Sequence, residues 1–175
     1  MRRFFGVLIA AAALGACEAQ VNGERIKLGE GGPYVLSIAA RGEGESVILL
    51  RGPDGKATAA LIEGGASSLL TEGEAQALFA EAAPNAAIEG GERVDLKLPG
   101  LQVTAVDDAG AGEERARVSI GFGKSRIEVD AQAGSEERAI VRISGMDAAA
   151  ARDFLREQDE FSEEIKAAML AELGL

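Results

Sequence analysis

One side chain near the start of the chain is placed for covalent chemistry: Cys17, the only cysteine among the 175 residues. Arg2 and Arg3 precede an apolar run from Phe4 to Leu14, and two small residues separate that run from the thiol. A basic start, a short apolar run and small residues before a cleavage point are the pattern of a secretion signal. As a helix this run would cover only about 16 Å, whereas the hydrocarbon core of a bilayer is roughly 30 Å thick. A cleaved signal is therefore favoured over a membrane-spanning helix.

The segment Leu14-Gly15-Ala16-Cys17 resembles the lipobox of bacterial lipoproteins, in which an aliphatic and two small residues precede the modified cysteine. The resemblance implies cleavage before Cys17, attachment of diacylglycerol to its sulfur and acylation, with palmitate for example, of the new amino group. In enteric bacteria a residue other than aspartate after the cysteine, here Glu18, implies the outer membrane. The expected location is thus the cell envelope, on the periplasmic face of the outer membrane, with membrane lipid as the partner of Cys17. The alternative is an ordinary secretion signal cut nearby, with Cys17 unmodified.

Composition excludes several classes of function. The formal charge of −11 becomes about −13 once Arg2 and Arg3 are removed, and such an acidic chain is a poor nucleic-acid binder. The chain has no histidine and would have no free thiol after acylation of Cys17. Histidine-based triads, cysteine nucleophiles and zinc sites of cysteine and histidine are therefore excluded. We expect no enzyme, no cofactor, no metal and no nucleic-acid partner, and an unknown envelope protein or ligand as the further partner.

The string Gly-Phe-Gly-Lys-Ser at 121–125 ends like a phosphate-binding loop. A full motif needs a further glycine five residues before Gly123, where Val118 stands, and it needs a strand followed by a helix. Here the string joins two strand-like runs. We interpret Gly123-Lys124 as a hairpin turn.

Other candidate groups are weaker. Adjacent carboxylates need to converge across a cleft to act as an acid–base pair, and neighbours in a chain are usually solvated. Residues 107–114 could gather oxygen ligands for calcium, but their spacing does not follow the calcium-loop pattern. The glycine-rich run before Tyr34 could approach a ligand closely or simply lead into a strand. Ser67-Ser68 has no partner base at a recognisable spacing. The acidic pairs are Asp107-Asp108, Glu113-Glu114, Glu136-Glu137 and Glu163-Glu164.

The first half of the chain predicts strands and one helix. A polar tether is expected over 18–23, followed by strands at 24–28, 34–40, 46–51 and 57–62. Thr71 and Glu74 form a capping-box pattern that predicts a helix to Ala83, ended by Pro84-Asn85. Leu78 and Phe79 are expected to pack this helix on the sheet.

The second half predicts a further meander. Val94, Leu96 and Leu98 alternate with charged residues and predict a half-buried strand, followed by a Pro99-Gly100 turn and a strand from Leu101. A polar loop is expected over 107–114. Strands then follow on either side of Gly123-Lys124 and at 138–143, and these predict the opposed pairs Phe122–Ser125, Ile120–Ile127, Val118–Val129, Arg117–Asp130, Val129–Val141 and Glu128–Arg142.

The chain ends in two predicted helices. Ser144 and Asp147 offer caps for a helix over 148–158, and Ser162 and Gly174 bound a helix over 163–172. Two short helices, each with one apolar side, are expected either to cover an exposed apolar face of the sheet or to form a partner-binding helical hairpin. In the second helix the expected apolar stripe consists of Phe161, Ile165, Ala168 and Met169.

Together these patterns predict an α+β fold: one or more antiparallel β-meander sheets with one inserted helix and two short C-terminal helices. The expected organisation is a signal peptide at 1–16, a lipidated cysteine and tether at 17–23, and a single domain at 24–175. The expected function is that of a membrane-tethered extracytoplasmic lipoprotein with a non-enzymatic envelope-interaction or structural role. The alternatives are a small-ligand-binding module with an apolar pocket between sheet and helices and, third, a carboxylate-dependent hydrolase without a recognisable motif.

Overall fold

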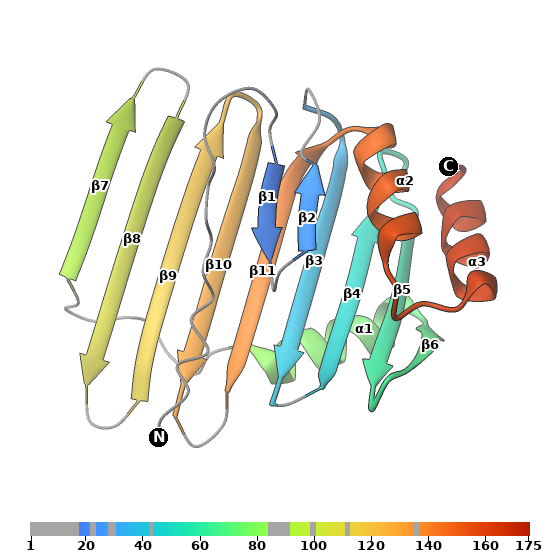
Figure 1. Ribbon diagram of the computed structural model, residues 1–175, viewed down its shortest axis with the longest axis horizontal. Coiled ribbons are helices and arrows are strands. Elements are labelled where there is room, and N and C mark those ends of the chain that lie inside the picture. Colours follow the sequence, from blue (N-terminus) through green and yellow to red (C-terminus); the bar gives the residue numbers. More distant parts are fainter. Residues whose placement is uncertain are drawn as a thin grey trace.

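The computed structural model describes residues 18–21, 24–27, 31–42, 44–83, 92–98, 101–110, 113–134 and 137–175. These residues form one nine-stranded antiparallel sheet, a separate two-stranded hairpin and three helices (Figure 1). The fold is α+β, with one helix inserted after the first meander and two helices at the C-terminus, as predicted.

The elements have the following bounds. The two-stranded hairpin consists of β1 (Glu18–Val21) and β2 (Glu24–Lys27). The large sheet consists of β3 (Tyr34–Arg41), β4 (Glu45–Arg51), β5 (Ala57–Glu63), β6 (Ala66–Leu70), β7 (Glu92–Leu98), β8 (Leu101–Gly110), β9 (Glu113–Phe122), β10 (Ser125–Ala133) and β11 (Arg138–Met146). The helices are α1 (Glu72–Ala82), α2 (Ala148–Glu157) and α3 (Glu163–Leu173).

Two meanders are fused into one sheet. Its strand order is β6-β5-β4-β3-β11-β10-β9-β8-β7, so β3–β6 and β7–β11 each run in chain order and meet where β11 pairs with β3. At this junction Val141 lies opposite Ile38 and Ile143 lies opposite Leu36. Apolar residues on both central strands thus continue one apolar face through the junction, which joins the meanders into a single sheet.

The predicted register of the central hairpins is confirmed. Across the Gly123-Lys124 turn, Phe122 lies opposite Ser125 and Arg117 opposite Asp130. The other four predicted pairs are also present: Ile120–Ile127, Val118–Val129, Val129–Val141 and Glu128–Arg142. A shift by one residue would turn one strand's apolar side chains toward water, which is why the alternation specifies the pairing so strongly.

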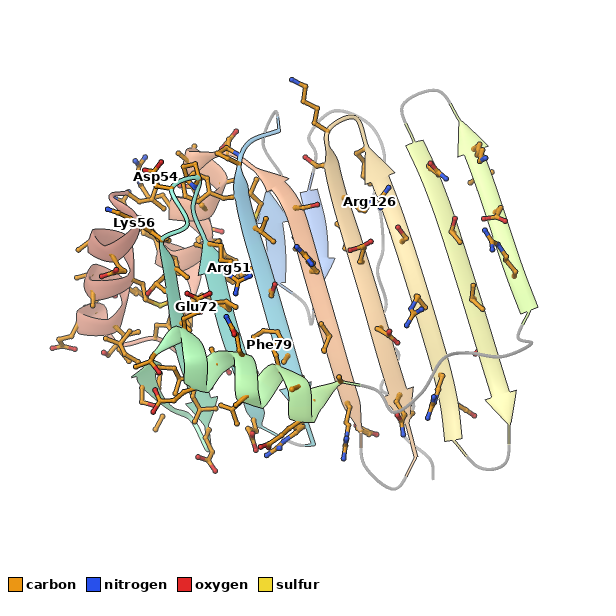
Figure 2. The ribbon with its side chains drawn as sticks, turned by 180° about the vertical axis from the view of Figure 1, so that it is seen from behind. Arg51, Asp54, Lys56, Glu72, Phe79 and Arg126 are labelled. Atoms are coloured by element: carbon orange, nitrogen blue, oxygen red, sulfur yellow. The ribbon has the colours of Figure 1, made fainter. Side chains whose placement is uncertain are left out.

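The sheet has two faces with different covers. We call the face under α2 and α3 the front face and the face under α1 the back face (Figures 1 and 2). The front core contains Leu36, Leu50, Ile143, Leu155 and Met169 among its fully buried side chains. The smaller back core joins Leu78 and Phe79 of α1 to Val47 and Leu49 of β4.

Helix α1 begins where the sequence predicts. The Thr71 Oγ1 accepts from the Glu74 N–H at 3.3 Å, and the Glu74 carboxylate accepts from the Thr71 N–H at 2.8 Å. These two bonds satisfy donors that the first turn of a helix would otherwise leave free. The helix ends at Ala82, and Leu78 and Phe79 pack on the sheet as predicted.

The C-terminal helices are also capped, with two differences from expectation. Asp147 caps α2 by accepting from the Ala150 N–H at 2.8 Å, whereas the Ser144 hydroxyl donates to the Arg126 carbonyl at 3.5 Å and does not cap. Ser162 caps α3, and Gly174 ends it with φ 69°. Phe161, Ile165 and Met169 are buried, but Ala168 is exposed, because it borders an open hollow at the edge of the sheet.

The glycine-rich run before Tyr34 approaches the chain's own backbone. The Gly32 N–H donates to the Gly145 carbonyl at 2.8 Å, at a β-bulge between Ser144 and Met146. A Cβ at Gly32 would lie 2.4 Å from the Met146 carbonyl oxygen. This close approach explains the glycine, and Tyr34 then enters β3 as a buried side chain.

The structure differs from the sequence expectations in three places. Strand β6 was not expected, and β8 and β9 extend through Gly110 and from Glu113, into the segment interpreted as a polar loop. Residues 18–21, expected as part of a tether, pair with β2 instead. In each case backbone pairing with the neighbouring strand extends the element into polar sequence, and the domain boundaries themselves remain a prediction.

Candidate functional site

A single row of apolar side chains crosses the front face from β7 to β4. The exposed fraction along this row is 46% at Leu96, 4% at Ile120 and 0% at both Leu36 and Leu50. The paired residues of the row are Leu96, Val103, Ile120, Ile127, Ile143, Leu36 and Leu50. The same kind of side chain on the same face is therefore exposed at one edge and fully buried five strands away.

The front helices explain the burial at the β3–β6 end of this row. On the front face α2 contacts β3, and α3 contacts β5 and β6; on the back face α1 contacts β3–β6 and β11. We call β3–β6 the covered half of the sheet and β7–β9 the open half (Figure 1).

The apolar surface of the open half is here named the open face. Its two most exposed side chains are Val94, at 62%, and Leu96 on β7. The paired rows continue it over β8 and β9 with half-buried side chains. The open face consists of Val94, Leu96, Val103, Ala105, Ala116 and Val118.

The back of the open half is polar. Arg93 Nε donates to Asp95 at 2.7 Å, and Thr104 Oγ1 donates to the same carboxylate at 2.8 Å. Both hydrogen bonds lower the pKa of Asp95 below its ordinary value, and the bond from Arg93 has the larger effect. Arg117 pairs with Asp130 across β9 and β10, with Nε at 3.1 Å from the carboxylate. The open half therefore has a charged, hydrated back and a front that is apolar from Val94 to Val118, with the exposed carboxylates Asp107 and Glu114 near one end.

The sequence-predicted sites do not converge. Cys17 lies outside the described residues, and so do Glu136 and the Pro99-Gly100 turn. The Gly-Lys-Ser string is a hairpin turn between β9 and β10, as interpreted from the sequence. Ser67 and Ser68 lie in edge strand β6, where Ser67 pairs with Ile62.

The carboxylate pairs are distributed along the sheet and helices. Asp107 lies in β8, Glu114 in β9, and Glu163 and Glu164 in the first turn of α3. Hydrogen bonds from its own backbone N–H and from Ser162 lower the pKa of Glu164. Within the described ranges, no three side chains of histidine, cysteine, aspartate or glutamate gather as a metal site would require.

A hollow of about 290 Å³ lies between α3, the start of α1 and the edge of the covered half. Its volume is at the lower end for small-molecule pockets. Glu72 on its wall pairs with Arg51 at 2.7 Å, and Figure 2 shows these two side chains pointing toward each other. The lining residues are Ala57, Thr58, Leu69, Leu70, Thr71, Glu72, Ala168 and Glu172. This open, partly polar hollow differs from the apolar pocket expected for a ligand-binding module.

Sequence reasoning missed the open face, because alternation at Val94 and Leu96 was interpreted as half-burial. A width argument could have found it. Nine strands about 4.8 Å apart span roughly 38 Å, whereas two helices side by side cover about 20 Å. Two C-terminal helices are thus too narrow to cover one face of such a sheet.

No protein-family model, curated protein or solved structure matches this chain. In the part of the chain that the structure describes, none of the helices is long and apolar enough to cross a bilayer.

Proposed function

We propose that this protein is an exported lipoprotein, anchored by acylated Cys17, that serves a non-enzymatic interaction or structural role in the cell envelope through its open face. The observation that carries the proposal is the exposure of Val94 and Leu96 on a face whose other large apolar side chains are mostly buried. A filled core with an exposed apolar surface is typical of a protein that binds a partner.

The anchor is supported by the sequence around Cys17 and by the location of β1. Strand β1 starts one residue after Cys17, pairs with β2, and β2 contacts α2. Figures 1 and 2 agree that this hairpin lies on the front side of the sheet. The strand that follows Cys17 in the chain therefore lies on the side that carries the open face. Such an anchor is stable, because two or three acyl chains hold a protein on a membrane, whereas a single chain binds only marginally.

The test has two arms in the protein's own host. Intact-mass analysis should show a chain that begins at Cys17 and carries acyl mass, and Cys17→Ser should lose that mass and leave the membrane fraction. A photo-crosslinking residue at Val94 should capture an envelope component other than this chain in native membranes, whereas the same residue at Asp95 should capture little of that component. Asp95 is the matched control, because it neighbours Val94 on β7 and lies on the back face.

The two arms can fail separately. An unprocessed chain in the soluble cell interior would contradict the anchor. Equal capture from Val94 and Asp95 would contradict the open face as the contact surface and leave the anchor standing.

A further inference from the structure

Strand β7 is the free edge of the open half. It is the last strand of the sheet order, and its residues 93–97 are all exposed. An edge strand leaves one row of backbone N–H and C=O groups unpaired, and such a row can pair with another strand.

The devices that usually block an exposed edge are weak at β7. Its pairing with β8 runs over seven consecutive residues, Glu92 to Leu98, without a register shift, so no bulge bends this edge away. Within residues 93–97 the side chains on the front face are Val94 and Leu96, and neither is charged. The charges of 93–97 lie on the back face and include both signs, so they can attract as well as repel.

We propose that β7 pairs antiparallel with β7 of a second copy of this chain, in the register centred on Leu96. This proposal goes beyond the function proposed above and does not depend on acylation of Cys17. The argument follows from the charges that each register brings together.

In the register centred on Leu96, the two leucines face each other and Asp95 lies opposite Lys97 of the other copy. Twofold symmetry repeats this pair, so the dimer gains two opposite-charge contacts on the back face. On the front face the two Leu96 side chains form an apolar pair. Opposite charges directly across a strand pair stabilise it, and so do apolar pairs.

The neighbouring symmetric registers are worse. Centring on Asp95 would place the two aspartates opposite each other and Arg93 opposite Lys97, so every charged pair would be repulsive. Centring on Val94 would pair Arg93 with Asp95 but would leave Lys97 beyond the paired part of β7. Arg93 also already donates to Asp95 within its own strand, which reduces what a new contact would add.

Symmetric registers also keep the faces aligned. Residues opposed in an antiparallel pair project to the same side, so both copies present the open face in one direction. A register centred between two residues would instead set apolar side chains beside charged ones. In the proposed dimer the two open faces form one continuous surface, and β1 of each copy lies on the same side of it.

The test uses single introduced cysteines in the full chain, purified in detergent and in native membranes. In the proposed register the Cα atoms of residue 96 are about 5 Å apart, within disulfide range. Those of residue 94 are displaced by four positions, or about 13 Å, beyond that range. Leu96→Cys should therefore crosslink under mild oxidation, whereas Val94→Cys should not, although Val94 is the more exposed. The parent chain, with Cys17 alone, sets the baseline.

A charge exchange sharpens the result. In the Leu96→Cys background, Asp95→Lys or Lys97→Asp alone should lower the crosslinked fraction about tenfold, because both interchain pairs become repulsive. The double exchange should restore it. A mixture of the two single exchanges should crosslink between unlike chains, since each Lys then meets an Asp, and this shows that both variants are folded.

Three results would overturn the proposal. Strongest crosslinking from Val94→Cys or Asp95→Cys would show another register. A Leu96→Cys yield at the parent baseline would show that β7 does not pair with a second copy. A yield unaffected by either single exchange would remove the charge argument on which the register rests.

Discussion

The covered and open halves of one sheet have the same alternation and different burial. Leu36 and Leu96 lie in one row on the front face, and Leu36 is fully buried while Leu96 is half exposed. The difference lies in the front helices, of which α2 contacts β3, the strand that carries Leu36. Alternation along a strand therefore determines which face a side chain occupies, and a second layer determines whether that face is dry.

The largest expected contrast is between two leucine truncations in the same row. Leu36→Ala should lower the free energy of unfolding by about 3 kcal/mol, because it opens a cavity in a filled core. Leu96→Ala should cost less than about 1 kcal/mol, because little of its side chain is buried. Denaturant unfolding of both variants measures the contrast. Equal losses would show that the open face is packed in solution.

The second contrast is between two glycines with positive φ. A Cβ at Gly145, with φ 85°, would lie 2.6 Å from the Lys124 carbonyl oxygen, whereas Gly123, with φ 54°, has open space around it. Gly145→Ala should cost about 3 kcal/mol or more, from strain and collision at the entry to α2. Gly123→Ala should cost about 1 kcal/mol, from strain alone. Thermal and denaturant unfolding distinguish the two, and a mild Gly145→Ala variant would contradict the bulge geometry.

The third prediction concerns the cap of α1, which covers the back of the covered half. Thr71→Ala should cost about 1 kcal/mol at neutral pH. The Thr71 hydroxyl and then its backbone N–H lower the pKa of Glu74 below its ordinary value of 4.5. A carboxyl group whose pKa is lower in the folded state adds stability at pH values above its unfolded-state pKa. This added stability is lost as the pH falls through the folded-state pKa.

The difference between the parent and Thr71→Ala should therefore shrink below about pH 4.5, which unfolding at pH 7 and pH 3 would measure. Gln76→Ala, on the exposed side of the same helix, is the control for a general helix effect. A cost of Thr71→Ala that is the same at both pH values would contradict the role of Glu74.

The smallest effect is expected at the charged back of the open half. Arg117 and Asp130 form an exposed ion pair, so Arg117→Ala should cost no more than about 0.5 kcal/mol, and 1 M salt should remove the difference. Reversing both charges together should leave stability near that of the parent. A salt-independent loss above about 2 kcal/mol would mean that this side is covered rather than hydrated.

The sequence was most informative where local chemistry decides. Thr71 and Glu74 predict the start of α1, and the Gly123-Lys124 turn with its alternating flanks predicts the register of β9 and β10, because each depends on neighbours in the chain. The junction of β3 with β11 was not predictable in this way. Those strands are about a hundred residues apart, and their pairing depends on apolar faces that many other strands also offer.

The exposure of the open face could not be predicted from the sequence for a related reason. Val94 and Leu96 alternate as a half-buried strand does, and nothing within β7 records that the two C-terminal helices lie over the other half. The glycines at 31 and 32 were similarly ambiguous. Their partner, the bulge at Gly145, is distant in sequence, so close approach to a ligand and close approach to the chain's own backbone predict the same residues.

Thiol labelling in native membranes tests most directly whether the open face is a contact surface. Val94→Cys should react slowly with a water-soluble maleimide in the native envelope and rapidly after purification in detergent. Asp95→Cys, on the opposite face of the same strand, should react rapidly in both. Equally rapid labelling of Val94→Cys in membranes and after purification would contradict the account, because it would show that the open face meets only water.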